Sequence, residues 1–201
     1  MPSRRLIRVA ENFVTLVTEV RQCNFCPDLP LGPLPIFQIG QQARILIAGQ
    51  APGRLTHAKG LPFDDVSGDR LRQWMGISRD LFYDDSKLAC LPMGFCYPGK
   101  GKGGDLPPRR ECAPRWRHRL LQLLPSLQLT LVIGQYAMAF HFPDDKRSLT
   151  EQVRAWDGQS ACIPLPHPSP RNGNWLGANP WFETDVLPML RHKVQMALHD
   201  P

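Results

Sequence analysis

Residues 43–68 read ARILIAGQAPGRLTHAKGLPFDDVSG, a short apolar run followed by a long polar loop. Its apolar run at 45–48 is typical of a buried strand. The run breaks into GQAPG at 49–53, where glycine and proline end the regular structure. A strand that ends in a small Gly- and Pro-containing loop is how open α/β sheets present chemistry at their carboxyl edge. We therefore expect this stretch to form one wall of an active site.

Apolar runs and helical patterns alternate along the rest of the chain. We predict strands at 43–48, 87–93, 129–133 and 161–165, and helices at 4–21, 69–75, 114–124, 136–142, 148–157 and 180–198. This alternation predicts an α/β fold, a three-layer α/β/α sandwich around a central four-stranded parallel sheet, in a single domain over 1–201. The loops after the first and fourth strands then face each other across one crevice.

The composition sets limits on location and partners. Of 201 residues, 42% are hydrophobic and 21% are charged, so an ordered soluble protein is the default. No apolar run approaches the ~20 residues of a membrane span, and the N-terminus lacks the apolar core of a secretory signal. We expect no membrane partner and a cytoplasmic protein, nucleoid-associated if it is bacterial. The net charge of +6 favours a polyanionic partner, and a solvated basic face is the alternative.

The loop after the fourth strand reads HPSPRN at 167–172. A lone histidine is more often structural than catalytic, but two prolines fix the shape of this loop around His167. An imidazole in such a position can stabilise an anion that develops on a leaving group. Ser169, Arg171 and Asn172 offer donors that suit phosphate oxygens.

Two aspartates follow an aromatic residue in the opening stretch. A carboxylate of Asp64 or Asp65 can orient or deprotonate a water molecule. The alternative is a helix start, with Asp65 or Ser67 as the N-cap of the helix at 69–75. Phe63 is either an ordinary core residue or a stacking surface for a flat heterocycle.

The spacing of the six cysteines is informative because no secretory signal accompanies them. Cys23 and Cys26 form a C-x2-C pair, whereas Cys96 and Cys112 are too far apart for the second knuckle of a zinc site. Four thiolates from a helix end and a long loop suit an iron–sulfur cluster. Cys90 and Cys162, which lie in predicted strands, are most simply small buried residues.

Together these segments resemble the uracil-DNA glycosylase superfamily. GQAPG at 49–53 looks like its first motif, and HPSP at 167–170 looks like its second. GLPF at 60–63 is similar to the segment whose Phe stacks on the flipped base, and DVSG at 65–68 to the Asp-x-Ser-Gly segment of family five. The cysteine spacing is similar to that of the iron–sulfur branches, families four and five. The resemblance spans roughly 23–172, and the whole HPSPRN segment looks like that of the single-strand-selective branch.

The resemblance implies a monofunctional DNA glycosylase, which hydrolyses the N-glycosidic bond of uracil or another deaminated base flipped out of DNA. It implies that Asp65 positions water and that His167 stabilises the departing base. The resemblance assigns base binding to Gly49, Gln50, Ala51 and Phe63, phosphate binding to Ser169, Arg171 and Asn172, and a structural iron–sulfur cluster, 4Fe–4S, to Cys23, Cys26, Cys96 and Cys112. We expect a monomer whose partner is DNA that contains a damaged base.

Three departures from the family pattern keep other functions open. Ala51 stands where several branches carry a water-activating Asp or Asn, and Gln50 stands where family four has Glu. No Asn lies near Pro92, where many branches read the edge of uracil. The alternative is a nucleic-acid-binding member of the same fold with little or no glycosylase activity. A zinc-dependent nucleic-acid protein is a more remote third function.

Overall fold

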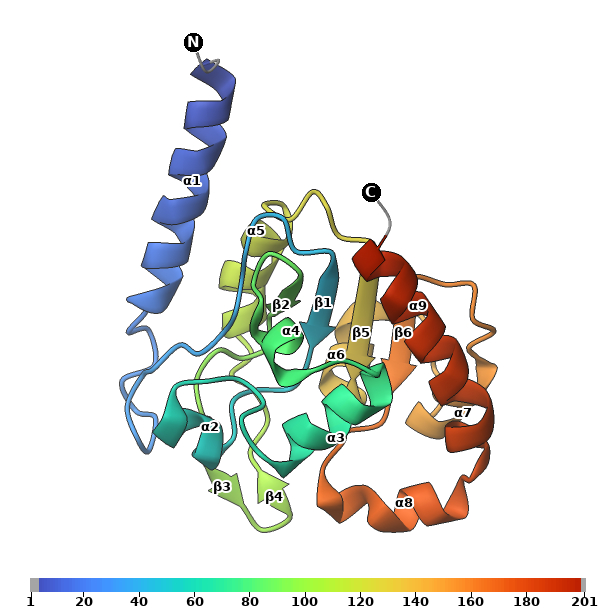
Figure 1. Cartoon of the computed structure of the whole chain (residues 1–201). Coiled ribbons are helices and arrows are strands. Elements are labelled where there is room, and N and C mark those ends of the chain that lie inside the picture. The colour runs from blue at the N-terminus through green and yellow to red at the C-terminus, as the bar shows by residue number, and fades with distance from the viewer. Residues whose placement is uncertain (1–3, 200–201) are drawn as a thin grey trace.

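The structure is a computed structural model that describes residues 4–199, with side chains from residue 13 onward (Figure 1). Four parallel strands form the central sheet in the order β2-β1-β5-β6. These strands are β1 Ile45–Ala48, β2 Leu88–Cys90, β5 Leu129–Ile133 and β6 Cys162–Leu165. With helices on both faces, this is the expected three-layer α/β/α sandwich, so the fold class is confirmed.

The order of the strands places a topological switch beside β1. The chain leaves β1 for β2 on one side and later returns to β5 on the other. Ile45 is in register with Leu88 of β2 and with Leu129 of β5, so β1 is hydrogen-bonded on both sides. In open α/β sheets, ligands bind outside the carboxyl ends of the strands at such a switch. The loop that follows β1 therefore starts at the expected position for a site.

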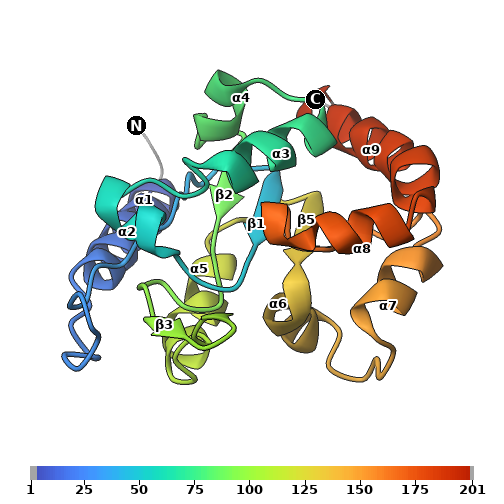
Figure 2. The ribbon, with the colours of Figure 1, turned by 90° about the horizontal axis from the view of Figure 1, so that it is seen from below.

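Helices cover both faces of the sheet (Figure 2). One face carries α3 Val66–Met75, α4 Arg79–Tyr83 and α9 Leu187–His199, and the other carries α5 His118–Leu121, α6 Gly134–His141 and α7 Leu149–Ala155. Alternate residues of β1 point to opposite faces. Ile45 and Ile47 pack in the same cluster as Leu71 of α3, whereas Leu46 packs in a second cluster with Leu120 of α5.

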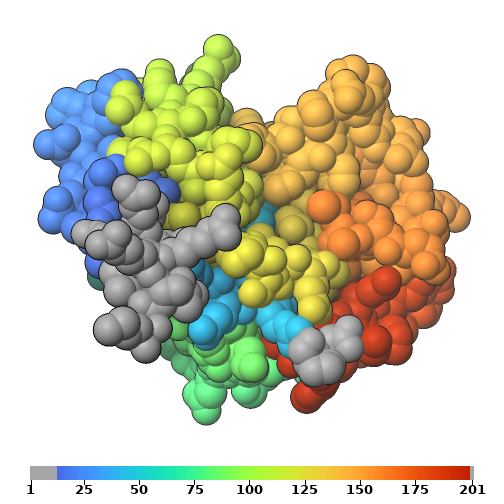
Figure 3. Space-filling model, turned by 90° about the horizontal axis from the view of Figure 1, so that it is seen from above, coloured from blue at the N-terminus to red at the C-terminus, as the bar shows by residue number. Residues whose placement is uncertain are grey.

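The N-terminal helix, α1 Arg4–Arg21, borders the second cluster through Leu16 and Val20. The apolar pattern expected at 4–12 lies outside the described side chains. From above, the blue segment that follows residue 12 lies beside the yellow-green segment around 100–120 (Figure 3). An ion pair of 3.1 Å between Arg119 and Glu19 joins these two parts of the chain. The C-x2-C pair at the end of α1 is thereby brought to the loop that holds the later cysteines.

Several short elements were not expected from the sequence. They are α2 Arg54–Lys59, α4 Arg79–Tyr83, the antiparallel pair β3 Lys100–Gly101 and β4 Gly104–Asp105, the 3₁₀ turn η2 Pro170–Asn172 and α8 Gly173–Ala178. The expected loop 94–112 therefore contains a hairpin. The C-terminal helix begins as a π-helical turn, η3 Phe182–Val186, and the helix after Cys112 as η1 Ala113–Arg117. Two-residue strands and single turns are held by tertiary contacts, so local sequence patterns do not reveal them.

The second strand ends at Cys90, before Pro92, and is shorter than the predicted 87–93. It is an edge strand of the sheet, but Gln38 covers it through an antiparallel bridge to Cys90. The Gln38 side chain adds hydrogen bonds to the carbonyls of Phe82 and Leu88. The other edge strand, β6, contains Pro164, which an edge position tolerates. Among residues 4–199, no helix has both the length and the apolar character needed to cross a membrane.

Candidate active site

The predicted site residues meet at the carboxyl edge of the sheet. We call this group the edge site: the motif-one loop 49–53, the segment 63–65 and the motif-two loop 167–172. Two backbone hydrogen bonds fix the motif-one loop to the segment that follows β2, because Met93 and Gly94 donate to the carbonyls of Gly49 and Gln50 at 2.8 and 2.9 Å. Figure 2 looks onto this edge, with α2, β3 and α8 around it.

Phe63 forms part of the wall beside the motif-one loop. A Cβ atom at Gly49 would lie 3.8 Å from Cζ of Phe63, so the ring tip is next to this loop. Phe63 has a φ of 54°, a strained conformation for a bulky residue. Arg72 holds it there by donating a hydrogen bond to its carbonyl oxygen at 3.2 Å. The backbone of Gly68 also packs against this oxygen, so closely that an added Cβ would lie only 1.7 Å from it. Gly68 is therefore required for the approach of α3 to Phe63.

Asp65 is the N-cap of α3, and its Oδ1 accepts a hydrogen bond of 2.9 Å from the backbone N–H of Gly68. Of the two predicted N-cap candidates, Asp65 is therefore confirmed and Ser67 is wrong, because the helix begins at Val66 and Ser67 lies in its first turn. Within the described chain, Oδ2 of Asp65 has no recorded hydrogen bond. Asp65 is thus fixed by one oxygen and can bind a further group through the other.

Asp64 has a different environment from its neighbour. Its carboxylate pairs with Arg79 at 2.7 Å and with Lys59 at 3.2 Å. The hydrogen bond from Arg79, followed by that from Lys59, lowers the pKa of Asp64. These two partners come from α2 and α4 and occupy the Asp64 carboxylate, which leaves Asp65 as the freer of the two carboxylates to bind water.

His167 is held by its own loop. The backbone N–H of Ser169 donates to Nδ1 of the imidazole at 3.1 Å, so the proton of the neutral ring belongs on Nε2. Burial lowers the pKa of His167, while the carboxylates of Asp65 and Asp105 act in the opposite direction. The ring is therefore neutral at pH 7 and presents an N–H donor on Nε2.

Two of the three expected phosphate-binding side chains also shape the motif-two loop. Oγ of Ser169 accepts from the N–H of Arg171 at 3.2 Å, and Nδ2 of Asn172 donates to the carbonyl of His167 at 2.8 Å. Arg70 of α3 donates to the carbonyl of Ser169 at 3.1 Å and ties the loop to that helix. Arg171 is the charged residue among the three, and it is exposed, so its guanidinium can contact a phosphate.

Sequence reasoning missed the hairpin β3–β4, which adds a third side to the edge site. Nε2 of Gln50 donates to the carbonyl of Leu106 at 3.0 Å, just after β4. A Cβ at Gly53 would lie 3.4 Å from Oδ2 of Asp105, and a Cβ at Gly104 would lie 3.3 Å from Nη1 of Arg171. The hairpin thus lies against both motif loops. The sequence feature that pointed to this hairpin was the position of Asp105 in a Gly-rich loop after a strand.

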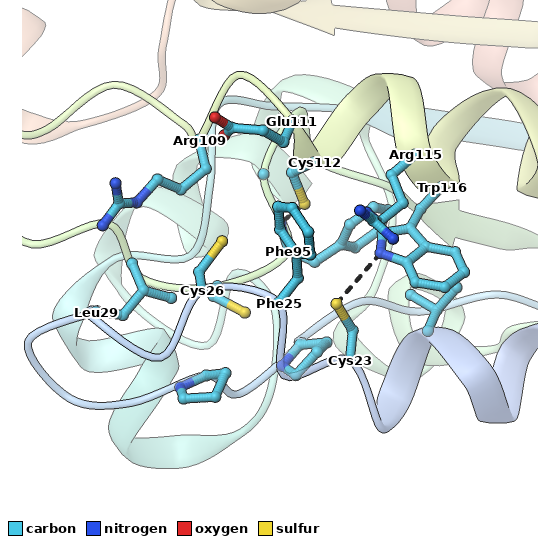
Figure 4. A pocket seen from close by; sticks show the side chains of 15 residues that line it. Cys23, Phe25, Cys26, Leu29, Phe95, Arg109, Glu111, Cys112, Arg115 and Trp116 are labelled. Carbon is cyan, nitrogen blue, oxygen red and sulfur yellow. Dashed lines mark hydrogen bonds between the residues drawn. The ribbon is translucent and has the colours of Figure 1, made fainter.

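The four cysteines expected to bind a cluster line one mostly apolar pocket (Figure 4). We call it the cysteine pocket; it is formed by Cys23, Cys26, Cys96 and Cys112 with Phe25, Leu29, Phe95 and Trp116. Cys90 is instead buried in β2, where burial raises the pKa of its thiol to about 12, and Cys162 lies at the start of β6. The structure thus brings together the four predicted cysteines and leaves out the other two.

Hydrogen-bond donors point at three of these sulfurs. Phe95 N–H donates to Cys112 Sγ at 3.3 Å, the Trp116 indole donates to Cys23 Sγ at 3.3 Å, and the backbone of Leu34 donates to Cys96. N–H groups aimed at sulfur suit thiolate ligands. Burial, with a further contribution from the neighbouring cysteines, raises the pKa of Cys112 to about 12. Among the described residues, no three His, Cys, Asp or Glu side chains converge as a single-ion site requires. A cubane cluster takes one thiolate per iron, so its ligands fit a wider arrangement.

A buried arginine connects the two regions. Arg117 is 0% exposed and lies one turn after Cys112. Its Nη1 donates to the carbonyl of Leu91, at the end of β2, and its Nη2 donates to Nε2 of His141 at 2.9 Å. Burial, together with the charge of Arg117, lowers the pKa of His141 to about 4, so His141 is a neutral acceptor. Arg117 thus holds the strand end from which Met93 reaches the motif-one loop.

A family model described as the uracil DNA glycosylase superfamily matches residues 37–191. The matched range contains the whole sheet and every residue of the edge site, with Cys96 and Cys112 of the cysteine pocket. Members of this superfamily act on DNA and are generally glycosylases, which are hydrolases. The match covers more than half of the chain and agrees with the observed sheet. The chain therefore belongs to the uracil DNA glycosylase superfamily.

Proposed function

We propose that this protein is a monofunctional DNA glycosylase that removes uracil or another deaminated base from DNA. The observation that carries the proposal is that His167 and Asp65 lie at the same edge of the sheet, where Arg70 of α3 binds the motif-two loop. They come from loops about a hundred residues apart, yet the carboxylate is close enough to affect the pKa of the imidazole. A hydrogen-bond donor for a departing base and a carboxylate for water are the two groups that hydrolysis of an N-glycosidic bond needs.

In the proposed reaction, the flipped base lies beside the Phe63 ring and the motif-one loop. The bond between C1′ and the base nitrogen breaks, and both electrons leave with the base. Nε2–H of His167 donates a hydrogen bond to a carbonyl oxygen of the base and stabilises the negative charge there. Asp65 holds a water through Oδ2; the water oxygen bonds to C1′ and its proton passes to the carboxylate.

The DNA backbone would lie along the motif-two loop and the hairpin. The net charge of +6 favours association with a polyanion. The hairpin, which approaches the exposed Arg171 at Gly104, also carries Lys100 and Lys102. Both walls of the edge site come from one chain, so a monomer suffices. No disulfide joins any of the six cysteines, all of which lie within the described residues, and this fits a reducing compartment such as the cytoplasm.

As part of the same proposal, Cys23, Cys26, Cys96 and Cys112 bind a structural iron–sulfur cluster, 4Fe–4S. The apolar lining and the N–H donors to three sulfurs support it. Such a cluster would cross-link the end of α1 to the loop 96–112. Cys96 and Cys112 flank the hairpin, so fixing them also fixes the hairpin against the motif loops.

A second function has its own support in the structure. Gln50 donates its amide to Leu106, Ala51 carries no polar group, and Pro92 offers no amide to read a base. These residues favour a member that binds DNA with little or no glycosylase activity. On this alternative, the protein would bind abasic or single-stranded DNA without releasing bases.

One assay distinguishes the two functions. Protein purified anaerobically is incubated with oligonucleotides that carry uracil, hypoxanthine or xanthine, in single and double strands, and abasic sites are measured. Glycosylase activity predicts abasic sites with at least one base, and loss of that activity in Asp65→Asn and His167→Gln. Tight binding without abasic sites on any substrate would contradict the proposal and support the alternative.

A further inference from the structure

The hairpin β3–β4 carries an acidic side chain into the edge site. Leu106 and Gly104, the neighbours of Asp105, contact the motif-one and motif-two loops respectively, through Gln50 and Arg171. Asp105 stands between these two contacts, with Oδ2 at the turn around Gly53. The hairpin lies below the sheet in Figure 1, between α2 and α8. Asp105 thus belongs to the same group of side chains as His167 and Asp65.

The carboxylate of Asp105 is exposed and lacks a stabilising partner. Within the described residues, it has no recorded ion pair and no recorded hydrogen bond. The charged groups around His167 are Asp65 at the N-cap of α3, Arg70 within that helix, Arg171 from its own loop, and Asp105 from the hairpin. Asp105 is the second carboxylate that affects the imidazole electrostatically, after Asp65.

An exposed carboxylate is unfavourable at the place where a phosphate backbone docks. Phosphate contacts dominate the affinity of proteins for DNA, so each negative charge at the interface reduces binding. The folded structure does not require the negative charge of Asp105, because within the described residues this side chain caps no helix and pairs with no cation. The Asp105 carboxylate thus opposes DNA binding and stabilises no contact in the free protein. A role in the hydrolysis of the glycosidic bond explains its presence best.

That chemistry has a need for a second carboxylate. Hydrolysis of a glycosidic bond passes through a transition state with positive charge on the sugar, and glycoside hydrolases characteristically place two carboxyl groups beside it. Asp65 alone has to cap α3 and hold the water. A second negative charge on the other side of the sugar would stabilise the cation without taking part in proton transfer.

We propose that Asp105 is a second catalytic carboxylate of the edge site, which stabilises the positive charge that develops on the deoxyribose. This inference rests on the proposed glycosylase function. Asp105 forms no bond in the step: the electron pair still leaves with the base, and the proton of the attacking water still goes to Asp65. Its contribution is the charge, placed opposite the group that His167 stabilises on the base.

The test measures rate and affinity separately in Asp105→Asn. Base release is followed under single-turnover conditions on the best substrate of the wild-type protein, and the Kd for the same DNA is measured by fluorescence anisotropy. We expect base release to fall about 100-fold, while DNA binds as tightly as before or more tightly. Asp105→Glu, which keeps the charge, should retain more activity than Asp105→Asn.

Asp157→Asn is the matched control. Asp157 is exposed in the loop before β6, at the opposite edge of the sheet, and an Asn there can still accept from the N–H of Gln159. It removes the same charge from the protein, so the net charge changes equally in both variants. The control should leave both the rate and the Kd close to the wild-type values.

Two results would overturn the role of Asp105 while leaving the proposed function intact. One is an unchanged rate in Asp105→Asn. The other is an equal loss of rate and affinity with a lower Tm, which would make the residue structural for the hairpin. A wild-type protein that releases no base from any substrate overturns the proposed function itself, and the role of Asp105 with it. The wild-type assay alone identifies that case.

Discussion

The edge site and the cysteine pocket are neighbours in the fold, but they hold their reactive groups in different ways. In the edge site, backbone and side-chain hydrogen bonds of the chain fix each residue: Gly68 N–H fixes Asp65, and Ser169 N–H fixes His167. In the cysteine pocket, four half-buried cysteines line one mostly apolar space, and burial raises the pKa of Cys96 to about 11. Arg109 and Arg115 line the pocket together with Glu111, so these side chains leave most of the charge of four thiolates unbalanced.

This difference indicates that the cysteine pocket, and not the edge site, depends on a bound group that the chain does not provide. Hydrogen bonds preorganise the edge site in the free protein, so substitutions there should change the chemistry more than the stability. The cysteine pocket joins the end of α1 to the loop 96–112 through little regular structure. A bound cluster would add its binding free energy to folding, so substitutions there should act on stability first.

The largest expected effect is that of Cys112→Ser. Loss of one ligand should remove the cluster and destabilise the protein by about 4 kcal/mol, because binding of a structural metal group contributes directly to folding. Iron and labile sulfide, the visible absorption spectrum and chemical denaturation measure the result. Cys162→Ser makes the same change outside the pocket and should keep the full iron content. A Cys112→Ser protein with wild-type iron would contradict the assignment of this ligand.

Asp65→Asn should act on the reaction instead. An Asn still accepts a hydrogen bond as an N-cap, so the free energy of unfolding should change little. Base release should fall about 1,000-fold, because an amide cannot take the proton of the water. Single-turnover rates and denaturation curves measure the two effects. Asp64→Asn is the control: it breaks the ion pairs with Lys59 and Arg79 but should leave the rate near that of the wild type. A larger fall in Asp64→Asn would reverse the assignment.

The sequence predicted the sheet because its four apolar runs are long and their loops are marked by glycine and proline. It left the choice between Asp64 and Asp65 open, since only the contacts of Lys59 and Arg79 separate the two. The grouping of four cysteines followed from spacing and resemblance. Asp105 was missed because its neighbours, Gln50, Gly53 and Arg171, come from loops that are distant in the sequence.

A smaller effect is expected at the wall of the edge site. Phe63→Leu keeps an apolar side chain but removes the aromatic face, and base stacking contributes about 1–3 kcal/mol. We expect the Kd for DNA that contains the target base to rise about tenfold, with little change for undamaged DNA. Phe140→Leu, at an exposed aromatic residue of α6, is the comparison variant. Equal losses on both kinds of DNA would mean that Phe63 supports the fold and does not contact the base.

The smallest effect concerns Arg117, which links the two regions. The pKa of His141 is lowered from 6.5 to about 4, so the folded protein keeps the ring neutral while the unfolded chain takes up a proton below pH 6.5. The stability that comes from the neutral ring is therefore complete above pH 6.5 and is lost as the pH falls towards 4. Between pH 7 and 5.5 we expect a loss of about 1 kcal/mol, measured by urea denaturation.

His141→Gln tests this assignment, because its side-chain oxygen can accept from Arg117 at every pH. The variant should lose less stability between pH 7 and 5.5 than the wild type. The lowered pKa of His167 acts in the same direction, so some pH dependence should persist and disappear only in the double variant with His167→Gln. An undiminished pH dependence in His141→Gln would mean that the Arg117–His141 contact does not control the pH response. If the contact does, mild acid should loosen the end of β2, and with it the motif-one loop, before it affects the cysteine pocket.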